Sequence, residues 1–442
     1  MPGSRTLTHR RRNRVRGHPG TPVRPAASGR AAGVAAQSVV PRPAAPATGI
    51  HSRSAKRTPV TRTVDVAVLG GGVVGASIAH HLAGAGVSVA LVERSSGTHR
   101  SATSNTAGQI RLHHSDPADA QLAALSFGTF ENWGEKIGGD AGFRRTGFAF
   151  LVGERHTDIL RDNVKVLTDL GVEAIVLTPA EFADRHPGLN LDGVAAVAYE
   201  PRSGYADPHR TRTAFLDQAR GVTVLTSRSG GRLLWSGQRV SGVDTGAERV
   251  AAGEVVLAAG AWSGALLGEF APPLRTKRVG LIVADAGDLP AREHLPMVID
   301  DLTGTYFRPA FDHSVLFGVP LEGWDTEPDD ANDPPERDRE AAARARIDRR
   351  LPGLARAPRT SAAAAADGYT PDGRALIGRL FAGLYLATGF NGGGFKVAPS
   401  VGRAVAAELT GAGDQPELVP YRPDRFAAGR EPVAPIPRYA TM

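Results

Sequence analysis

The chain has 442 residues, of which 41% are hydrophobic and 22% charged, as expected for a globular protein of two or three structural units. It has no cysteine, which excludes disulfides, thiolate metal sites, iron–sulfur clusters and cysteinyl-linked cofactors. The formal net charge is +7, but residues 1–62 hold 13 of the 52 basic residues and no acidic one, so the rest of the chain is mildly acidic. We therefore expect no nucleic-acid partner for the main body.

Residues 1–62 are rich in Ala, Pro, Gly and Ser and carry the basic run RRRNRVR at 10–16. They lack a hydrophobic period, so we expect a disordered extension, with folding beginning near Thr63. A secretory or twin-arginine signal needs an apolar run after the basic cluster, and the candidate AAGVAAQSVV is short and far downstream. A mitochondrial-type transit peptide fits the Arg-rich composition. We favour a poorly constrained extension of a cytoplasmic protein.

The first predicted element is a buried parallel strand at 64–69, followed by glycines at a characteristic spacing. Gly70, Gly72 and Gly75 fit G-x-G-x-x-G. The first glycine permits a tight turn, the second lets the backbone approach a pyrophosphate, and the third lets the next helix pack closely. We expect that helix at about 73–83, with its N-terminal amide groups facing the phosphates.

A second strand is predicted at 87–92, and it ends at Glu93, 23 residues after Gly70. An acidic residue at this place is expected to accept a hydrogen bond from a ribose hydroxyl, and it argues against a 2′-phosphate there. A membrane span is the alternative for this apolar run, but His80, His81 and four glycines interrupt it. The ordered series of strand, turn, helix, strand and acid predicts a dinucleotide-binding unit.

Three later stretches favour FAD as the dinucleotide, and one of them is DGYTPDGRALIGRL at 367–380. GEVVLAAGAWS at 253–263 is another buried strand that runs into small residues. LYLATGFNGGGFK comprises a strand at 384–388, a glycine-rich turn at 389–394 and the start of a helix that we expect over 396–409. A helix N-terminus there would stabilise the negative charge of a reduced flavin. The alternative is a glycine-rich loop that only permits tight packing.

In combination, the motifs resemble the D-amino-acid oxidase (DAO) family of FAD-dependent amine oxidoreductases, most closely its sarcosine oxidase and glycine oxidase branch. The resemblance extends from about Val64 to about Pro423. The motifs that carry it are VAVLGGGVVGASIAHHLA, VSVALVER, GYADP (204–208), VVLAAGAWS, GTYFRP (304–309), DGYTPDGRALIG and ATGFNGGGFK. It implies a mixed α/β (α+β) fold in which a Rossmann-like FAD-binding domain is interleaved with an antiparallel-sheet substrate domain.

Domain boundaries follow from the same resemblance. The implied FAD-binding domain comprises 63–140, 195–268 and 360–425, the substrate domain comprises 141–194 and 269–359, and a C-terminal tail spans 426–442. Within the substrate domain the residues themselves predict strands at 148–152, 280–284, 306–309 and 315–319, with a hairpin turn at 311–314. An acidic, Pro-rich loop at 322–340 leads into a helix predicted at 341–351, which Pro352 and Gly353 end.

The resemblance also implies site residues. The expected cofactor contacts are Gly70, Gly72, Val73, Val74, Glu93, Arg94, Ala259, Gly260, Trp262, Gly392, Gly393, Gly394, Phe395 and Lys396. Arg111, in GQIRLHH, and Lys396 match the residues that clamp the substrate carboxylate and turn its Cα–H toward flavin N5. A surface ion pair for Arg111 and a solvated side chain for Lys396 are the alternatives. A cation in the first turn of a helix opposes the helix dipole, which favours a functional anion partner for Lys396.

Four more residues are candidates for the substrate pocket. Tyr306 and Arg308 alternate onto one face of their predicted strand, where either could touch substrate. His113 and His114 closely follow Arg111 and are candidates to shape the pocket or to bind the substrate amine, although a loop histidine is more often a bystander.

The chain departs from the sarcosine oxidase pattern at two positions. Asp367 stands where several of those enzymes tether FAD through cysteine, so we expect noncovalent FAD. No lysine lies at or near Leu316, where those oxidases place the lysine that promotes reaction with oxygen. The missing lysine leaves a dehydrogenase as an alternative to an oxidase.

These features together predict FAD-dependent oxidation of a small amine or amino acid, which we expect to be a secondary or cyclic amino acid, to an imine by hydride transfer to flavin N5. The first alternative is an amino-acid dehydrogenase that passes electrons to a quinone or a flavoprotein instead of oxygen. A weaker alternative is a non-catalytic flavin-binding protein. No metal site and no membrane span are expected, and the sequence leaves the oligomeric state open.

Overall fold

The computed structural model describes residues 60–95, 101–228, 230–287, 289, 294–310, 313–320 and 323–427. These residues all belong to one compact unit, Arg57–Met442. Four predicted segments lie wholly or partly outside the described residues, namely the extension at 1–62, the hairpin turn at 311–314, the acidic loop at 322–340, whose first residue is not described, and the tail at 426–442.

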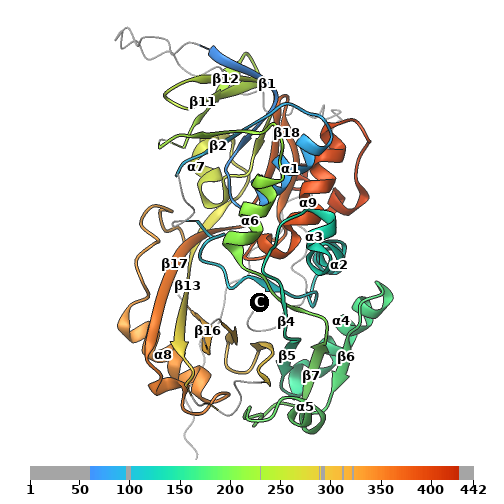
Figure 1. Cartoon of the computed structure of the whole chain (residues 1–442), viewed down its shortest axis with the longest axis vertical. Helices are drawn as coiled ribbons and strands as arrows, with labels where there is room; N and C mark the ends of the chain where they lie inside the picture. Colours follow the sequence, from blue (N-terminus) through green and yellow to red (C-terminus); the bar gives the residue numbers. More distant parts are fainter. Residues whose placement is uncertain are drawn as a thin grey trace, which may run out of the picture. The chain divides into compact units, whose positions relative to one another are not determined.

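The first large sheet has the predicted dinucleotide strand near its centre (Figure 1). Its strands run in the order β10-β11-β12-β1-β2-β9, and β19 pairs with both β12 and β18. Their bounds are β1 (Val60–Leu69), β2 (Val89–Glu93), β9 (Thr223–Thr226), β10 (Arg232–Ser236), β11 (Arg239–Asp244), β12 (Arg249–Leu257), β18 (Leu376–Phe381) and β19 (Leu384–Thr388). Because β1 pairs in parallel with β2 and with β12, the predicted parallel strand is confirmed.

Helices cover one face of this sheet in a shared apolar cluster. They include α1 (Val73–Gly84), α2 (Pro117–Glu131), α3 (Trp133–Lys136), α6 (Pro208–Asp217) and α9 (Gly394–Leu409), while the short α7 (Ser263–Leu267) follows β12. Helices α1 and α9 approach closely, because a Cβ at Gly402 would lie 2.1 Å from the hydroxyl oxygen of Ser77. That hydroxyl donates to the carbonyl of Ala398 at 2.8 Å, so the two helices that follow the glycine-rich turns are joined.

The second large sheet has the order β17-β13-β16-β15-β14-β5-β7-β6. Its strands are β5 (Phe148–Val152), β6 (Ile175–Leu177), β7 (Ala196–Glu200), β13 (Arg275–Asp285), β14 (Met297–Asp300), β15 (Thr305–Pro309), β16 (Ser314–Val319) and β17 (Arg359–Tyr369). All neighbours are antiparallel except β5 and β14. Figure 1 shows β13 and β17 as long strands that run side by side.

The remaining elements complete the second sheet and its surroundings. Its helices are α4 (Thr157–Asp169), α5 (Pro179–Arg185) and α8 (Arg337–Asp348), and a small third sheet contains β3 (Gln109–Ile110), β4 (Arg144–Arg145) and β8 (Gly204–Tyr205). One face of the second sheet carries Phe307 and Phe317 in a cluster with α8. The other carries Leu281, Tyr306 and Leu316, and this face is called the inner face below.

The structure differs from the sequence predictions at several boundaries. Strands β7 and β17 belong to the second sheet, although they fall in ranges expected for the FAD-binding domain. Their partners β5 and β13 lie far away in the chain, so no local pattern reveals the pairing. The helix predicted at 341–351 begins at Arg337 and ends at Asp348, because Asp338 and Glu340 suit a first helical turn.

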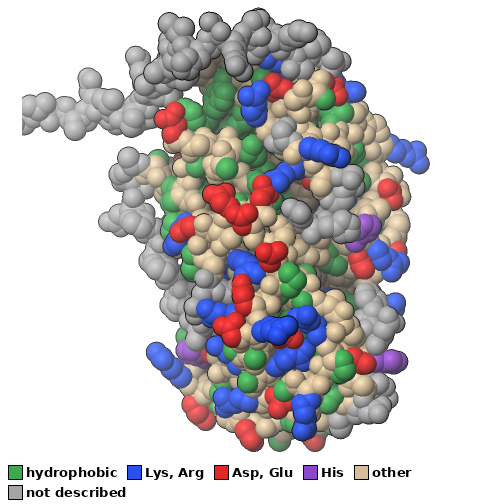
Figure 2. All heavy atoms as spheres, turned by 90° about the vertical axis from the view of Figure 1, so that its left-hand side faces the viewer, with side chains coloured by type: hydrophobic (Ala, Val, Ile, Leu, Met, Phe, Trp, Pro, Cys, Tyr) green, Lys and Arg blue, Asp and Glu red, His purple; other side chains and the backbone are tan. Residues whose placement is uncertain are grey.

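Charge is mixed on the face of the molecule that Figure 2 shows, where basic and acidic side chains alternate instead of forming a basic stripe. Among the helices that the structure describes, none has the length and apolarity needed to cross a bilayer.

Candidate active site

The first glycine-rich turn is built so that two of its glycines cannot be replaced. Gly70 has φ +112°, and a Cβ there would lie 2.4 Å from the carbonyl oxygen of Ala258. A Cβ at Gly75 would lie 1.9 Å from the carbonyl oxygen of Gly70. Among the described residues, the only atom within 4 Å of a Cβ built on Gly72 is the Thr103 hydroxyl oxygen, at a tight 3.1 Å. No described backbone atom blocks the approach to Gly72, where a pyrophosphate is expected to lie.

Glu93 is held beside this turn at the end of β2. Its carboxylate accepts from the N–H of Gly71 at 2.7 Å and from the N–H of Ser95 at 3.0 Å. The Arg212 side chain, from α6, donates to the carbonyl of Gly71 at 2.5 Å, and the N–H of Val73 donates to Thr103 at 3.1 Å. Sequence reasoning missed Arg212 and Thr103, since no fixed spacing links either of them to the glycines.

Trp262, one of the cofactor residues expected after β12, meets Arg94. The guanidinium of Arg94 lies 5.3 Å from the centre of the Trp262 ring and pairs with Asp329 at 2.5 Å. Trp262 also donates to Asp329 at 3.2 Å, so the acidic loop predicted at 322–340 reaches this place. Gly260 follows Ala259 with φ +54°, and no atom of the residues that the structure describes lies within 4 Å of a Cβ built on it.

The second glycine-rich turn is joined to the DGYTP segment by Asn391, which has φ +52°. Its side chain accepts from the N–H of Thr370 at 2.9 Å and donates to the carbonyl of Gly389 at 2.7 Å, while its N–H donates to Gly368 at 3.0 Å. Helix α9 starts at Gly394, two residues earlier than predicted. The turn ends with the expected residues Gly392, Gly393, Gly394 and Phe395.

Lys396 lies in the first turn of α9 with only 5% of its surface exposed. Its Nζ is 4.0 Å from a Cβ built on Gly393, and it makes no hydrogen bond or ion pair with any described residue. Burial, and then the charge of Arg111, lower the pKa of Lys396 to about 7, while Asp119 and Asp367 act in the opposite direction. It is not the solvated side chain considered as an alternative.

Arg111 is half-buried, and desolvation of its guanidinium lowers its pKa to about 10 against the opposing charges of Glu200 and Asp119. Its guanidinium donates to the carbonyl of His113 and lies 5.8 Å from the centre of the Phe148 ring. It forms no ion pair within the described part of the chain. The structure thus brings two cations from distant segments within electrostatic reach of each other.

His114 lies close to both cations. Burial, followed by the charges of Arg111 and Lys396, holds its pKa well below the usual value, so the imidazole is neutral. Its Nε2 is buried and has no hydrogen-bond partner among the residues described. A neutral ring nitrogen in this position can accept a hydrogen bond from a ligand. His113 instead stacks on Phe150, with 4.9 Å between the ring centres.

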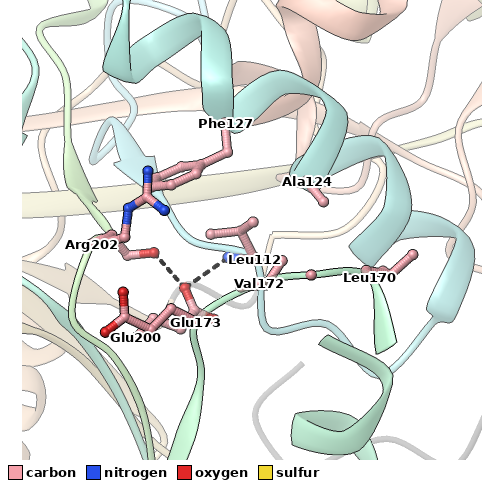
Figure 3. Close-up of a pocket in the computed structure, with 10 residues that line it drawn as sticks. Leu112, Ala124, Phe127, Leu170, Val172, Glu173, Glu200 and Arg202 are labelled. Atoms are coloured by element: carbon pink, nitrogen blue, oxygen red, sulfur yellow. Dashed lines mark hydrogen bonds between the residues drawn. The ribbon is translucent and has the colours of Figure 1, made fainter. Parts of the chain in front are cut away.

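Glu200 supports the segment that carries Arg111. Figure 3 shows it at the wall of a cavity of about 120 Å³, together with Leu112, Phe127 and Arg202. Its Oε2 accepts from the N–H of Leu112 at 3.0 Å and from the Ser203 hydroxyl at 2.5 Å. Burial raises the pKa of this carboxyl group. Sequence reasoning missed Glu200 because it comes from β7, 89 residues after Arg111.

Tyr306 and Arg308 share a face of β15, as their alternation predicts. The Tyr306 ring lies over Gly318, where a Cβ would come within 2.2 Å of it, and burial raises its pKa to about 12. The Arg308 guanidinium lies 4.1 Å from the centre of the Tyr205 ring. It donates to the carbonyls of Ala107 and Pro309, the latter at 2.7 Å.

A dinucleotide with a flavin fits these residues on two observations. The two glycine-rich turns both precede helices, and among the described residues a Cβ would meet nothing at Gly260 and only the Thr103 hydroxyl at Gly72. Gly392 also has space, since the nearest atoms to a Cβ there are the Tyr369 hydroxyl at 3.7 Å and the Asp367 carboxylate at 3.9 Å. The described residues contain no group of three or more His, Asp or Glu placed to hold a metal ion.

Comparison with known proteins gives consistent matches. A sequence model of the FAD-dependent oxidoreductase (DAO) family matches residues 65–408. The glycine oxidase of Pseudomonas aeruginosa is 30% identical over 81% of this chain and 98% of its own length. FAD-dependent oxidoreductase domain-containing protein 1 of Xenopus laevis is 28% identical over 79% of each chain. The crystal structure of L-proline dehydrogenase from P. horikoshii aligns with a TM-score of 0.74 and 27% identity, covering 84% of this chain and 99% of that chain.

Proposed function

The chain belongs to the DAO family of FAD-dependent oxidoreductases, and on that premise we propose that it oxidises a small secondary or cyclic amino acid to the imine. The family places it among the FAD-dependent amino-acid and amine oxidoreductases. The choice of an amino acid over a simple amine is our inference from the site.

One observation carries this inference. Arg111 and Lys396 are 285 positions apart, yet Lys396 is buried, Arg111 is half-buried, and both charges lower the pKa of the same neighbour, His114. Burying a cation without a paired carboxylate is costly, so two such cations together indicate that an anionic ligand belongs between them. A substrate α-carboxylate meets this requirement with charge-assisted hydrogen bonds.

In this proposal the residues of the chain bind and orient the substrate. Arg111 and Lys396 hold the carboxylate, and the neutral His114 accepts a hydrogen bond from the substrate nitrogen. Tyr306, on the inner face of the second sheet, covers the bound substrate and excludes water. Bound FAD would supply the hydride acceptor at flavin N5. No residue of the chain is assigned as a base.

We propose that FAD is held noncovalently by Gly70, Gly72, Val73, Val74, Glu93 and the residues around the second turn. Because the chain has no cysteine, a covalent thioether link to FAD is excluded. A covalent link through histidine is left to experiment. Acid precipitation is the test. The flavin should stay in the supernatant, and yellow colour in the washed precipitate would contradict noncovalent binding.

The substrate class is tested by anaerobic bleaching of the flavin. We expect N-methyl and cyclic amino acids to bleach the purified yellow protein, and the matching amines without a carboxylate to bleach it only at much higher concentration. Equal bleaching by both series would overturn the proposed substrate class while leaving the family unchanged.

A dehydrogenase is the second candidate function, and Leu316 favours it. This residue is buried with Ala107 and Leu281 on the inner face, at the position where the oxidase pattern would have a lysine. Stopped-flow reoxidation separates the two functions. A dehydrogenase should react slowly with dissolved oxygen and quickly with a soluble quinone, and rapid reoxidation by air would identify an oxidase.

We also propose that the protein is cytoplasmic, a location with which the absence of cysteine is compatible. Fractionation of the source cells with an antibody to the chain would test this.

A further inference from the structure

A second cavity, of about 390 Å³, lies on the inner face of the second sheet. Its walls include Val283 of β13, Leu316 of β16 and Ala310, which follows β15. These three residues pack with Tyr306 in one apolar cluster, so the cavity adjoins the proposed substrate site on the side of Tyr306. A volume of this size can hold part of a small organic molecule.

The cavity connects to the carboxylate clamp through a short series of neighbours. Tyr306 acts on the pKa of Tyr369, and the Tyr369 hydroxyl lies beside Gly392 together with the carboxylate of Asp367. Asp367 in turn acts on the pKa of Lys396. This series of groups, together with the packing of Tyr306 against Val283, Leu316 and Ala310, puts the cavity on the side of Lys396 that Tyr306 occupies.

Arg308 lines the cavity and is held rigidly. Two backbone carbonyls, those of Ala107 and Pro309, accept hydrogen bonds from it, and its guanidinium lies against the ring of Tyr205. Only 6% of its surface is exposed, and no carboxylate among the described residues forms an ion pair with it. Its Nη2 makes no hydrogen bond within those residues. A desolvated guanidinium with unused donors is a site for an anion.

We propose that Arg308 binds a second carboxylate on the substrate, carried at the end of a short aliphatic chain that lies along Val283, Leu316 and Ala310. This inference rests on the proposed function, in which Arg111 and Lys396 already hold the α-carboxylate. The substrate class is then an N-alkylated or cyclic amino acid with an anionic side chain. The apolar wall matches the methylene groups between the two carboxylates, and the rigid fork of Arg308 matches the terminal one.

The cavity also provides a matched control of opposite charge. Asp285, at the end of β13, lines the same cavity but is exposed, and its carboxylate accepts from the N–H of Gly287 at 2.9 Å. A negative charge there does not attract the proposed ligand. Removing it should preserve or increase the preference for a second carboxylate, whereas removing Arg308 should abolish that preference.

The test compares N-methylglutamate with N-methylglutamine, which differ only in the terminal charge, by anaerobic reduction of the FAD-loaded protein. We expect the wild type and Asp285→Asn to reduce faster with N-methylglutamate at low concentration, by roughly 10- to 100-fold in kcat/KM, the range for one charge-assisted hydrogen bond. In Arg308→Leu the ratio should fall close to one, and Arg308→Lys should keep part of it.

Binding of glutarate and butyrate gives a readout without turnover, through the change that each causes in the flavin absorption spectrum. Arg308→Leu should lose the preference for glutarate, and its retained flavin spectrum checks that the variant is folded. Equal affinity of the wild type for both probes would overturn the second-carboxylate proposal. So would an equal loss for both probes in Arg308→Leu, because Arg308 would then bind the α-carboxylate. Failure of every amino acid to bleach the flavin would instead contradict the proposed function.

Discussion

The two ends of the candidate site are made in different ways. The glycine-rich turn and Glu93 lie within 24 residues of each other, and backbone geometry fixes them, since a side chain at Gly70 or Gly75 would overlap the backbone. The substrate end instead joins Arg111, Lys396 and Arg308 from three distant segments, and desolvation lowers the pKa of each. The first end depends on shape and the second on unbalanced charge. They should therefore fail differently when they are altered.

The largest effect is expected at Gly72, where Gly72→Val should abolish retention of FAD. The added methyl groups would occupy the space left for the pyrophosphate, while the nearest protein contact to a Cβ is only the Thr103 hydroxyl at 3.1 Å. The ratio of flavin absorbance to protein absorbance after purification measures retention.

Gly84→Ala is the matched control for Gly72→Val, because Gly84 ends the same helix, is exposed and has no atom within 4 Å of its Cβ position. It should keep its full flavin content. Full flavin content in Gly72→Val as well would show that the turn is not the dinucleotide site.

The next largest effect is expected at the substrate end. Arg111→Leu and Lys396→Leu should each weaken amino-acid binding by about 2–5 kcal/mol, the usual cost of breaking a buried charged hydrogen bond, and FAD should remain bound. The double variant should lose less than the sum of the single losses, because both residues act on one anion. The amino-acid concentration that gives half-maximal anaerobic flavin reduction measures the loss of binding in the two single variants and the double variant. An unchanged concentration in both single variants would exclude the carboxylate clamp.

The same contrast explains how much the sequence could reveal. Strand, turn and helix from Val64 to Gly84 follow from local spacing, and the structure confirms them. Strand β17 contains a run of five alanines and carries no periodic signal, so its place beside β13 could not be predicted. Arg212 and Glu200 were missed for a related reason, since each reaches its partner only through tertiary packing.

A smaller effect is expected from pH, and it belongs to the substrate end alone. Burial, and next the charge of Arg111, lower the pKa of Lys396 to about 7, so the free protein loses this charge as pH rises through 7. Propionate, which has no amine to titrate, should therefore bind up to about tenfold more weakly for each pH unit above about 7. Flavin spectral titrations between pH 6 and pH 9 measure this.

Lys396→Arg is the control for the pH dependence, because its guanidinium stays charged over that range. Its propionate affinity should be nearly independent of pH. The free energy of unfolding of the unliganded wild type should change in the opposite direction to the affinity. Between about pH 7 and the ordinary lysine pKa, the unfolded chain holds a proton that the folded chain has lost, so stability rises with pH. A propionate affinity that does not vary with pH in the wild type would place Lys396 outside the anion site.

The smallest effect is expected where the acidic loop meets the dinucleotide end. Arg94 and Asp329 form a partly exposed ion pair, with side-chain exposures of 36% and 53%, and such pairs contribute about 1 kcal/mol or less. Asp329→Ala should therefore speed the release of FAD less than about fivefold, and added salt should reduce the difference. The control is Asp330→Ala, which removes a neighbouring exposed acid and should leave the rate of FAD release unchanged.

Arg94→Ala separates two roles of Arg94, namely contact with FAD and anchoring of the acidic loop. If Arg94 contacts FAD as the sequence resemblance implies, its loss should speed release more than the loss of Asp329, because contacts to the cofactor and to Trp262 disappear with it. Equal effects of the two substitutions would limit Arg94 to anchoring the loop.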